Sequence, residues 1–302
     1  LRLLTDMMIL ILFAISYDLL IGYVGLLSFG HALPYGIAAY MMGLGLQGGS
    51  TLPFLPEAAL TLPMAALLGL LTAVIVMAVT GALALRTDGV YFAMVTLAFA
   101  QIGYVLVVQL DDITNGSNGL FIQFPDLFGY SLANVTNVYY LILIVVVGSY
   151  LILRHIINSP YGLALMSIRE NAERAQFLGY SPFRLRLSAY IISGAFAAIA
   201  GMLFAISNTF ITPNMLYWTT TGDMVIWTII GGIGTLWGPA LGVSVTFGLE
   251  EFLSGAFIEA WPILLGVFFI FVVLLLPKGL AGLFTDEGYS VWKLVKRLNP
   301  WD

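Results

Sequence analysis

Residues 62–85 read LPMAALLGLLTAVIVMAVTGALAL and contain no charged side chain. They lie within a run of 28 uncharged residues between Glu57 and Arg86. A helix needs about 20 apolar residues to cross the hydrocarbon core of a bilayer. Inside lipid every backbone amide must be paired within the protein, and a helix pairs its own amides. The stretch therefore predicts a membrane-spanning helix.

Uncharged runs of similar length recur along the chain. Together with the first stretch they predict helical segments at 7–24, 29–46, 62–85, 90–110, 138–153, 187–206, 224–247 and 259–277. Strands of a membrane β-barrel would alternate in units of about ten residues, and these runs do not alternate. We expect an all-α integral membrane protein, a polytopic helical bundle of about 8–10 transmembrane segments. No linker divides the chain, so we expect a single domain over residues 1–302.

Two of these segments carry residues that interrupt helices. Segment 29–46 contains Pro34 and several glycines, and segment 224–247 contains GGIG at 231–234 and Gly238-Pro239. Both are expected to be broken or re-entrant helices. Residues 223–256 are too few for two full spans, which need about 40 residues, so we expect two short helices or a hairpin there. Paired broken segments in the two halves of a chain are typical of inverted repeats around a transport path.

The composition excludes several classes of protein. Of the 302 residues, 60% are hydrophobic and 9% are charged, whereas a soluble domain has about 25% charged residues. A soluble enzyme, a nucleic-acid-binding protein and a disordered chain are therefore excluded. The absence of cysteine excludes a disulfide scaffold, a thiolate metal site and a cysteine nucleophile. With two histidines in the chain we expect no metal site.

Basic residues predict the orientation in the membrane. Nine of the eleven lysines and arginines lie in the loop 154–186 or in the tail 278–302. The stretch 111–137 has three aspartates and no basic residue. The positive-inside rule then places the loop and the tail in the cytoplasm and 111–137 outside. Helical spacing of apolar and basic residues in the tail predicts an amphipathic helix on the inner leaflet.

The cytoplasmic loop contains the clearest local signals. Residues 159–188 read SPYGLALMSIRENAERAQFLGYSPFRLRLS. Ser159 and Pro160 are typical of a helix start, and Gly179 of a left-handed helix end. The sequence predicts one short amphipathic helix between them. Such a helix either docks into a groove on a soluble partner or is an ordinary loop helix with solvated charges.

Motifs for chemistry on this chain are missing. None of the three lysines is followed by Ser or Thr, so the phosphate-loop pattern G-x-x-x-x-G-K-[ST] does not occur. The metalloprotease pattern H-E-x-x-H and the nucleophile pattern G-x-S-x-G do not occur either. Uphill transport would need an ion gradient or an ATPase on another chain. An ion-coupled carrier needs ionisable residues within its spans, for which the candidates are Asp18, His31, Asp223, Glu250 and Glu251.

Six motifs in a fixed order resemble those of a known family. They lie at 18–32 (DLLIGYVGLLSFGHA), 89–101 (GVYFAMVTLAFAQ), 114–120 (TNGSNGL), 169–179 (RENAERAQFLG), 230–239 (IGGIGTLWGP) and 277–283 (PKGLAGL). They resemble the signatures of the LivM-type permeases of branched-chain amino acid ABC transporters, within the LivH/LivM/ribose-type permease family. The resemblance covers nearly the whole chain. Pro34 and Asn115 depart from it, since the family more often has a bulky apolar residue and a glycine there.

The resemblance implies a type II ABC importer-like permease in the bacterial inner (plasma) membrane. It implies as partners a second, LivH-like permease subunit, two cytoplasmic ATPase subunits, a periplasmic solute-binding protein and the lipid bilayer. No nucleic acid and no cofactor on this chain are expected; ATP and Mg²⁺ would bind the ATPase subunits. The implied cargo is a branched-chain or hydrophobic amino acid, moved by alternating access. Urea, amides or another small polar solute are alternatives within the family, and an ion-coupled carrier, a channel or a membrane enzyme are alternatives outside it.

The resemblance also yields candidate site residues, none of them catalytic. The expected ATPase-coupling residues in the loop 154–186 are Arg169, Glu170, Asn171, Arg174, Leu178 and Gly179. Candidates for the translocation path or a hinge are Asp18, Ser28, Gly30, His31, Gln101, Gly231, Gly232 and Gly234. The alternative for these is a structural role: Asp18 would accept backbone N–H bonds near residues 22–30, and His31 would cap a freed carbonyl. Candidates for docking the binding protein are Asn115, Ser117 and Asn118, with a solvated loop as the alternative.

Overall fold

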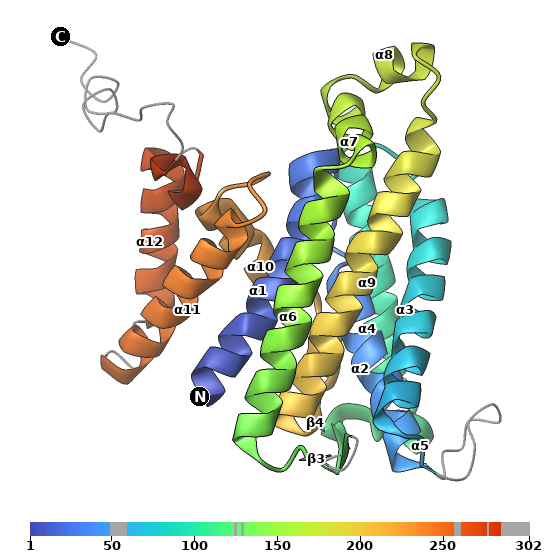
Figure 1. Cartoon of the computed structure of the whole chain (residues 1–302), viewed down its shortest axis with the longest axis vertical. Coiled ribbons are helices and arrows are strands. Elements are labelled where there is room, and N and C mark those ends of the chain that lie inside the picture. Colours follow the sequence, from blue (N-terminus) through green and yellow to red (C-terminus); the bar gives the residue numbers. More distant parts are fainter. Residues whose placement is uncertain (49–58, 124–125, 128–129, 257–260, 277, 285–302) are drawn as a thin grey trace.

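The structure is a computed structural model that describes residues 1–48, 59–123, 126–127, 130–256, 261–276 and 278–284. Its long helices are α1 (Arg2–Asp18), α2 (Ala32–Gln47), α3 (Leu62–Ala84), α4 (Val90–Gln109), α6 (Val135–Ile157), α9 (Pro182–Asn208), α10 (Trp218–Gly231), α11 (Gly238–Ala256) and α12 (Trp261–Leu275). They form a bundle with one long axis (Figure 1). The expected all-α polytopic membrane fold is confirmed.

Five helical segments among the described residues are long and apolar enough to cross a membrane. They are Arg2–Val24, Leu62–Ala84, Val90–Gln109, Val135–Ile157 and Pro182–Asn208. The first and last of these are mostly buried, whereas the other three expose large apolar side chains on their outer faces. α1 and α9 therefore form the centre of the bundle, with α3, α4 and α6 around it.

Close backbone approach explains several of the small residues at this centre. A Cβ added to Gly194 of α9 would overlap the side chain of Met77 of α3. A Cβ added to Gly69 of α3 would lie 2.6 Å from the carbonyl oxygen of Ala38 in α2. Small residues at such crossings let membrane helices pack backbone against backbone.

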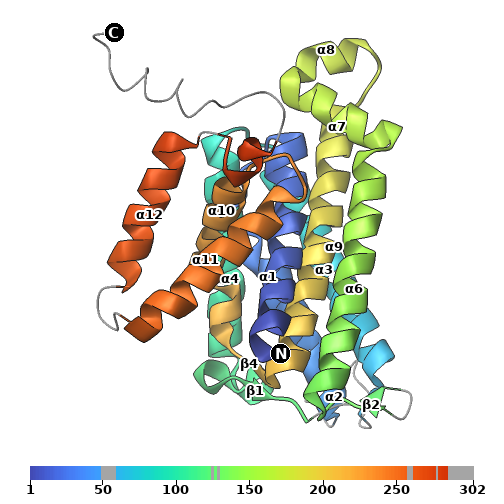
Figure 2. The ribbon, with the colours of Figure 1, turned by 60° about the vertical axis from the view of Figure 1, so that its left-hand side comes forward.

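The two ends of the bundle differ in charge. One end carries α7 (Pro160–Glu170) and α8 (Ala172–Phe177), as Figure 1 and Figure 2 show, and is called here the α7 end. The opposite end carries α5 (Asp111–Thr114), η2 (Gly116–Asn118) and two short antiparallel strand pairs. These pairs are β1 (Leu120–Phe121) with β4 (Phe210–Ile211), and β2 (Asp126–Leu127) with β3 (Tyr130–Ser131). The basic loop 154–186 and the acidic stretch 111–137 thus lie at opposite ends, as the charge pattern predicts.

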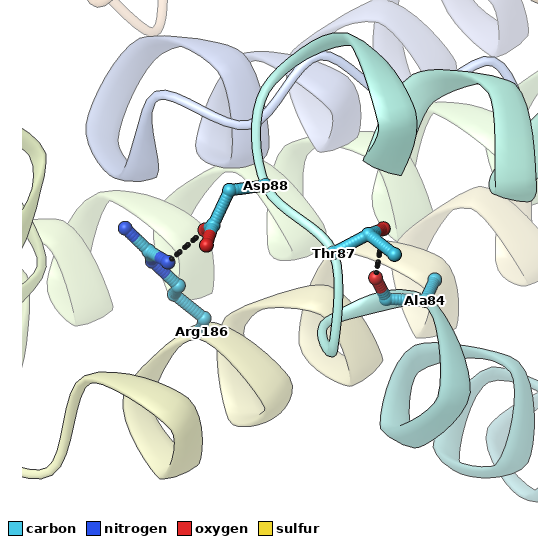
Figure 3. A network of polar contacts seen from close by, with 4 residues as sticks. All are labelled: Ala84, Thr87, Asp88 and Arg186. Carbon is cyan, nitrogen blue, oxygen red and sulfur yellow. Dashed lines mark hydrogen bonds and ion pairs between the residues drawn. The ribbon is translucent and has the colours of Figure 1, made fainter.

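An ion pair joins the α3–α4 loop to α9 at the α7 end. Arg186, near the start of α9, donates from Nη1 to Oδ1 of Asp88 in the α3–α4 loop over 2.9 Å (Figure 3). In the same loop the Thr87 hydroxyl donates to the Ala84 carbonyl over 2.8 Å. Asp88 is largely exposed, so the pair contributes at most about 1 kcal/mol to stability. Its role is to fix the loop beside α9.

The segment 29–46 differs from the prediction. α2 runs from Ala32 to Gln47 without interruption, and Pro34 lies in its first turn. Amides of the first turn have no acceptor within a helix, so proline costs no hydrogen bond there. The break comes earlier, in the non-helical residues 25–31 that follow the π-helix η1 (Leu19–Val24). The expected break of segment 29–46 therefore lies at its start, and α2 itself is uninterrupted.

The segment 224–247 is a helical hairpin, as the length argument predicts. α10 and α11 pack against each other and are joined by residues 232–237, called here the hairpin turn. The turn contains three left-handed residues: Gly232 (φ 117°), Gly234 (φ 80°) and Leu236 (φ 58°). The last of these is unusual, because a side chain in this conformation costs about 1–2 kcal/mol. Something outside the turn must therefore hold it in shape.

The loop 154–186 also differs from the prediction, because it contains two helices instead of one. α7 ends at Glu170, and Asn171 is extended (φ −158°, ψ 104°) before α8 begins. The Asn171 side chain caps α8 by accepting from the Arg174 amide over 2.9 Å. Ser159 does not cap α7; its hydroxyl donates to the Ile156 carbonyl. Gly179 has the left-handed conformation (φ 91°) expected of a helix end. The amphipathic tail predicted for 291–298 lies outside the described residues.

Candidate functional site

A buried carboxylate joins the two glycine-rich segments of the chain. Asp18, the last residue of α1, is fully buried. Its Oδ1 accepts a hydrogen bond from the Gly234 amide over 2.7 Å, and its Oδ2 accepts one from the Leu236 amide over 3.0 Å. Both donors belong to the hairpin turn. Asp18 therefore accepts backbone N–H bonds, which is the structural alternative that the sequence left open. The donors were expected near residues 22–30, but they are the amides of Gly234 and Leu236, 216 and 218 residues away.

Gly22 allows this contact to form. A Cβ at Gly22 would lie 2.5 Å from Oδ1 of Asp18 and 2.6 Å from the Gly234 amide nitrogen. Neither distance is possible for a real Cβ, so only glycine fits at this position of η1, where it packs against the hairpin turn. π-helical turns are rare and often occur at functional sites.

Arg169 approaches the same place from α7. Its guanidinium Nη1 donates a hydrogen bond to the carbonyl of Gly22 in η1. Its aliphatic stem lies against Gly25, where an added Cβ would be 3.0 Å from Cγ of Arg169. The same Nη1 lies 3.6 Å from the Cβ position of Gly234. Arg169 thus connects α7 to both η1 and the hairpin turn.

The residues after α12 cover the other side of the turn. A Cβ at Gly279 would lie 2.5 Å from the Cα of Gly232, and a Cβ at Gly232 would lie 2.7 Å from the Lys278 carbonyl. Three sequence motifs, at 18–32, 230–239 and 277–283, therefore meet Arg169 at one point of the α7 end. We call Asp18, Gly22, Arg169, Gly234 and Leu236 the α7-end junction.

The connector 25–31 enters the bundle without helical hydrogen bonds. The Phe29 amide donates to the hydroxyl of Thr96 in α4 over 3.1 Å, and the Ala32 amide donates to the hydroxyl of Thr221 in α10 over 2.9 Å. The Gly30 amide donates to the hydroxyl of Ser28 over 3.2 Å. Irregular backbone at membrane depth is tolerated when protein groups satisfy it in this way. Ser28 and Gly30 are buried parts of this connector.

His31 is fully buried where α1, α2 and α9 meet. Its Nε2 lies 2.8 Å from the hydroxyl of Ser193 in α9, and that hydroxyl also donates to the carbonyl of Ser16 in α1. The Tyr17 ring packs edge-on to His31 with centroids 5.2 Å apart. His31 therefore links three helices, which supports the structural role.

The predicted coupling residues separate into two groups. Arg169 belongs to the α7-end junction, and Asn171 caps α8. Glu170, Arg174, Leu178 and Gly179 are exposed. Phe177 and Leu178 are 92% and 76% exposed, so α8 presents an apolar tip surrounded by charges. Phe177 was not predicted, although its position beside Leu178 would have been a signal. We call Phe177, Leu178 and the exposed part of α8 the α8 tip.

Other predicted residues lie apart from the junction. Gly231 is the last residue of α10, and Gly232 is the first residue of the hairpin turn. Gln101 is half-buried on α4, away from the connector. Asn115, Ser117 and Asn118 are exposed at the opposite end, where Asn115 is left-handed (φ 57°). Asparagine tolerates this conformation, and its Nδ2 donates to the Gly119 carbonyl over 2.9 Å. Within the described part of the chain no group of three or more metal-ligating side chains occurs.

A cavity of about 380 Å³ lies between α10, α11 and α12. The carboxylates of Asp223 and Glu250 line it, together with the aromatic rings of Trp227 and Trp261. Carboxylates in membrane-embedded helices are costly unless they face water or a polar partner. The sequence offered both residues as ionisable candidates but could not show that they share a cavity.

Comparisons with known proteins agree with this architecture. A family described as "Branched-chain amino acid transport system / permease component" matches residues 1–276. The permease protein LivM of the high-affinity branched-chain amino acid transport system of Salmonella typhimurium is 29% identical over 91% of this chain and 68% of its own length. LivM of Escherichia coli K12 is also 29% identical, over 90% of this chain and 68% of its own length. LivH of Escherichia coli K12 is 27% identical over 90% of both chains.

No solved structure matches this chain significantly. The family match nevertheless covers all the long helices described above, including α1, α7 and the α10–α11 hairpin. It also covers every residue of the α7-end junction. The chain is therefore a multi-pass membrane protein that belongs to the family of permease components of branched-chain amino acid transport systems.

Proposed function

We propose that this chain is a membrane-spanning subunit of an ABC importer for branched-chain amino acids, driven by ATPase subunits on separate chains. The family match over residues 1–276 is the observation that carries the proposal. The sequence lacks the phosphate-loop pattern, which agrees with the proposal because ATP hydrolysis would then be carried out by a separate ATPase subunit. Alternating access would carry the cargo through the membrane.

The α8 tip is the proposed docking point for an ATPase subunit. Phe177 and Leu178 expose large apolar surface at the basic end, which the positive-inside rule assigns to the cytoplasm. A short helix with apolar anchors and a charged rim suits a groove on a soluble partner. Arg174 and Glu173 supply such a rim.

The binding protein, the second permease subunit and the lipid contacts are proposed from where exposed residues lie on the bundle. The exposed loop with Asn115, Ser117 and Asn118 lies at the opposite, outer end, where a periplasmic solute-binding protein would dock. A second permease subunit and lipid would cover the apolar outer faces of the bundle. An assembly with ATPases inside and a binding protein outside would belong in a bacterial inner membrane, which is the proposed location.

The cargo is proposed from the named relatives and from the chemistry of the cavity. The LivM and LivH relatives belong to branched-chain amino acid transport systems. The cavity beside Asp223 and Glu250 combines carboxylates, which attract an ammonium group, with aromatic walls suited to an apolar side chain. Urea and small amides carry no ammonium group, so competition of leucine uptake by urea tests the alternative cargo.

Co-purification tests the docking proposal. The chain is produced with its second permease subunit and ATPase subunits, either unaltered or as Phe177→Asp or Leu178→Asp. We expect each substitution to weaken ATPase association by at least about tenfold, as loss of an interface anchor does. Ser117→Asp, an exposed substitution at the opposite end, serves as the control and should leave ATPase association intact. Undiminished association and uptake in Leu178→Asp would contradict docking at the α8 tip.

A further inference from the structure

The hairpin turn depends on contacts from outside itself. The Thr235 hydroxyl donates to the Gly232 carbonyl and accepts from the Gly238 amide, which satisfies part of the turn internally. The Gly234 and Leu236 amides instead donate to the Asp18 carboxylate. The strained left-handed Leu236 is one of these two donors. Asp18 therefore holds the turn in a conformation that its own residues do not favour.

Arg169 and Asp18 act on the same short piece of backbone. Arg169 binds the Gly22 carbonyl, and Gly22 lies one helical turn after Asp18, packed against Gly234. Because Gly22 has no side chain, the backbone of η1 packs directly against the backbone of the hairpin turn. A displacement of η1 is therefore expected to displace the turn. Arg169 of α7 therefore contacts η1, and Asp18, which directly precedes η1, contacts the hairpin turn.

α7 is firmly attached to the bundle. Leu165 and Ile168 on its apolar face are buried, and the helix packs against η1, α6 and α9. A hydrogen bond of 2.7 Å also joins the hydroxyl of Tyr161 to that of Ser188 in α9. Because α7 packs directly against η1 and also binds it through Arg169, we expect a displacement of α7 to displace η1.

We propose that Asp18 is a positioning residue that transmits movement of α7 and α8 to the α10–α11 hairpin. This inference rests on the proposed function, because it takes an ATPase at the α8 tip as the source of the movement. When the α8 tip shifts, Arg169 displaces η1, and the Asp18 carboxylate carries the hairpin turn with it. The hairpin carries Asp223 and Glu250, so the shift reaches the walls of the cavity.

A fluorescent probe on the turn tests the transmission. Ile233 is 38% exposed in the hairpin turn, and the chain has no native cysteine, so Ile233→Cys accepts a single environment-sensitive maleimide dye. The labelled chain is reconstituted with the second permease subunit, the ATPase subunits and the binding protein. We expect a change in dye emission when ATP and Mg²⁺ are added. We expect Asp18→Asn, which keeps only one of the two acceptor oxygens, to reduce this change and to lower uptake per ATP hydrolysed by about tenfold or more.

Ser16→Ala is the matched control. Ser16 is also fully buried in α1, but its hydroxyl donates only to the Phe13 carbonyl within the same helix. The control should retain both the dye response and uptake. A full dye response together with normal uptake in Asp18→Asn would overturn the proposal.

A second variant covers the case in which Asp18→Asn does not assemble. Arg169→Ala leaves the carboxylate in place and alters a side chain at the surface of the bundle. We expect it to assemble and to reduce the dye response, and an undiminished response would overturn the proposal. If the unaltered complex binds its ATPases but does not take up leucine, the proposed cargo fails while the dye response still reports transmission.

Discussion

Asp18 Oδ1 and the Gly234 amide nitrogen lie 2.7 Å apart, although 216 residues separate them in the sequence. This contact brings together the two glycine-rich segments that the sequence singled out in the first and second halves of the chain. It also places both of them beside Arg169, in the loop 154–186. The centre of the bundle and this loop therefore share a common junction.

Gly22→Ala should disrupt this junction. The added Cβ would lie 2.5 Å from the Asp18 carboxylate, which cannot move away without leaving its two amide donors. Overpacking of this kind costs about 1–3 kcal/mol, so the melting temperature of the purified chain should fall clearly. Gly148→Ala in α6 is the control, because nothing lies within 4 Å of its Cβ position. Equal melting temperatures for the two variants would show that the junction is not tightly packed.

Thr96→Val should destabilise the connector 25–31. Valine has the shape of threonine but cannot accept the bond from the Phe29 amide, and the loss leaves a buried donor unpaired. Such a loss costs about 1–3 kcal/mol. Thr228→Val is the control, since Thr228 is also fully buried but bonds only to the Met224 carbonyl of its own helix. Thermal unfolding in detergent compares the two, and a larger effect of Thr228→Val would refute the account.

Tyr161→Phe and Ser188→Ala should each weaken the attachment of α7 to α9. A tyrosine hydroxyl is protonated at neutral pH and can donate, and burial raises the pKa of Tyr161 further. Each variant should lose about 1 kcal/mol of stability. Because both remove the same bond, the double variant should lose less than the sum of the two. Strict additivity in this double-mutant cycle would mean that the 2.7 Å contact contributes nothing.

Single cysteines should report which end of the bundle faces the cytoplasm. Ser117 and Gln176 are exposed at opposite ends, and the chain has no other cysteine. In intact cells with a permeabilised outer membrane, an impermeant maleimide should label Ser117→Cys and leave Gln176→Cys unlabelled. Inside-out vesicles should give the reverse pattern. The opposite result in both preparations would mean that the positive-inside assignment is wrong.

The sequence predicts those features of the fold that depend on local composition. Uncharged runs locate α3, α4 and α6 to within a few residues, because lipid imposes the length of a span. The hairpin α10–α11 follows from its length. A break in the first glycine-rich segment was expected, but its extent, residues 25–31, depends on acceptors in Thr96 and Thr221, which lie far away in the sequence. The division between α7 and α8 was missed because the Asn171 side chain caps a second helix.

The candidate site shows the same limit. Asp18, Arg169 and Gly234 were each identified as candidates, but their contact with one another is a tertiary property. No local pattern indicates that a carboxylate at the end of α1 binds amides of the α10–α11 turn. Asp223 and Glu250 were known as ionisable residues, and only the packing of α10 on α11 and α12 brings them to one cavity.

ATP-dependent uptake in proteoliposomes tests the central claim most directly. Radiolabelled leucine is added outside vesicles that contain this chain and its second permease subunit, with the binding protein outside and ATP and Mg²⁺ enclosed. Uptake against the gradient should occur only when the ATPase subunits are present, and Leu178→Asp should abolish it. Concentrative uptake by this chain with no ATPase present, driven by an imposed ion gradient, would contradict the account.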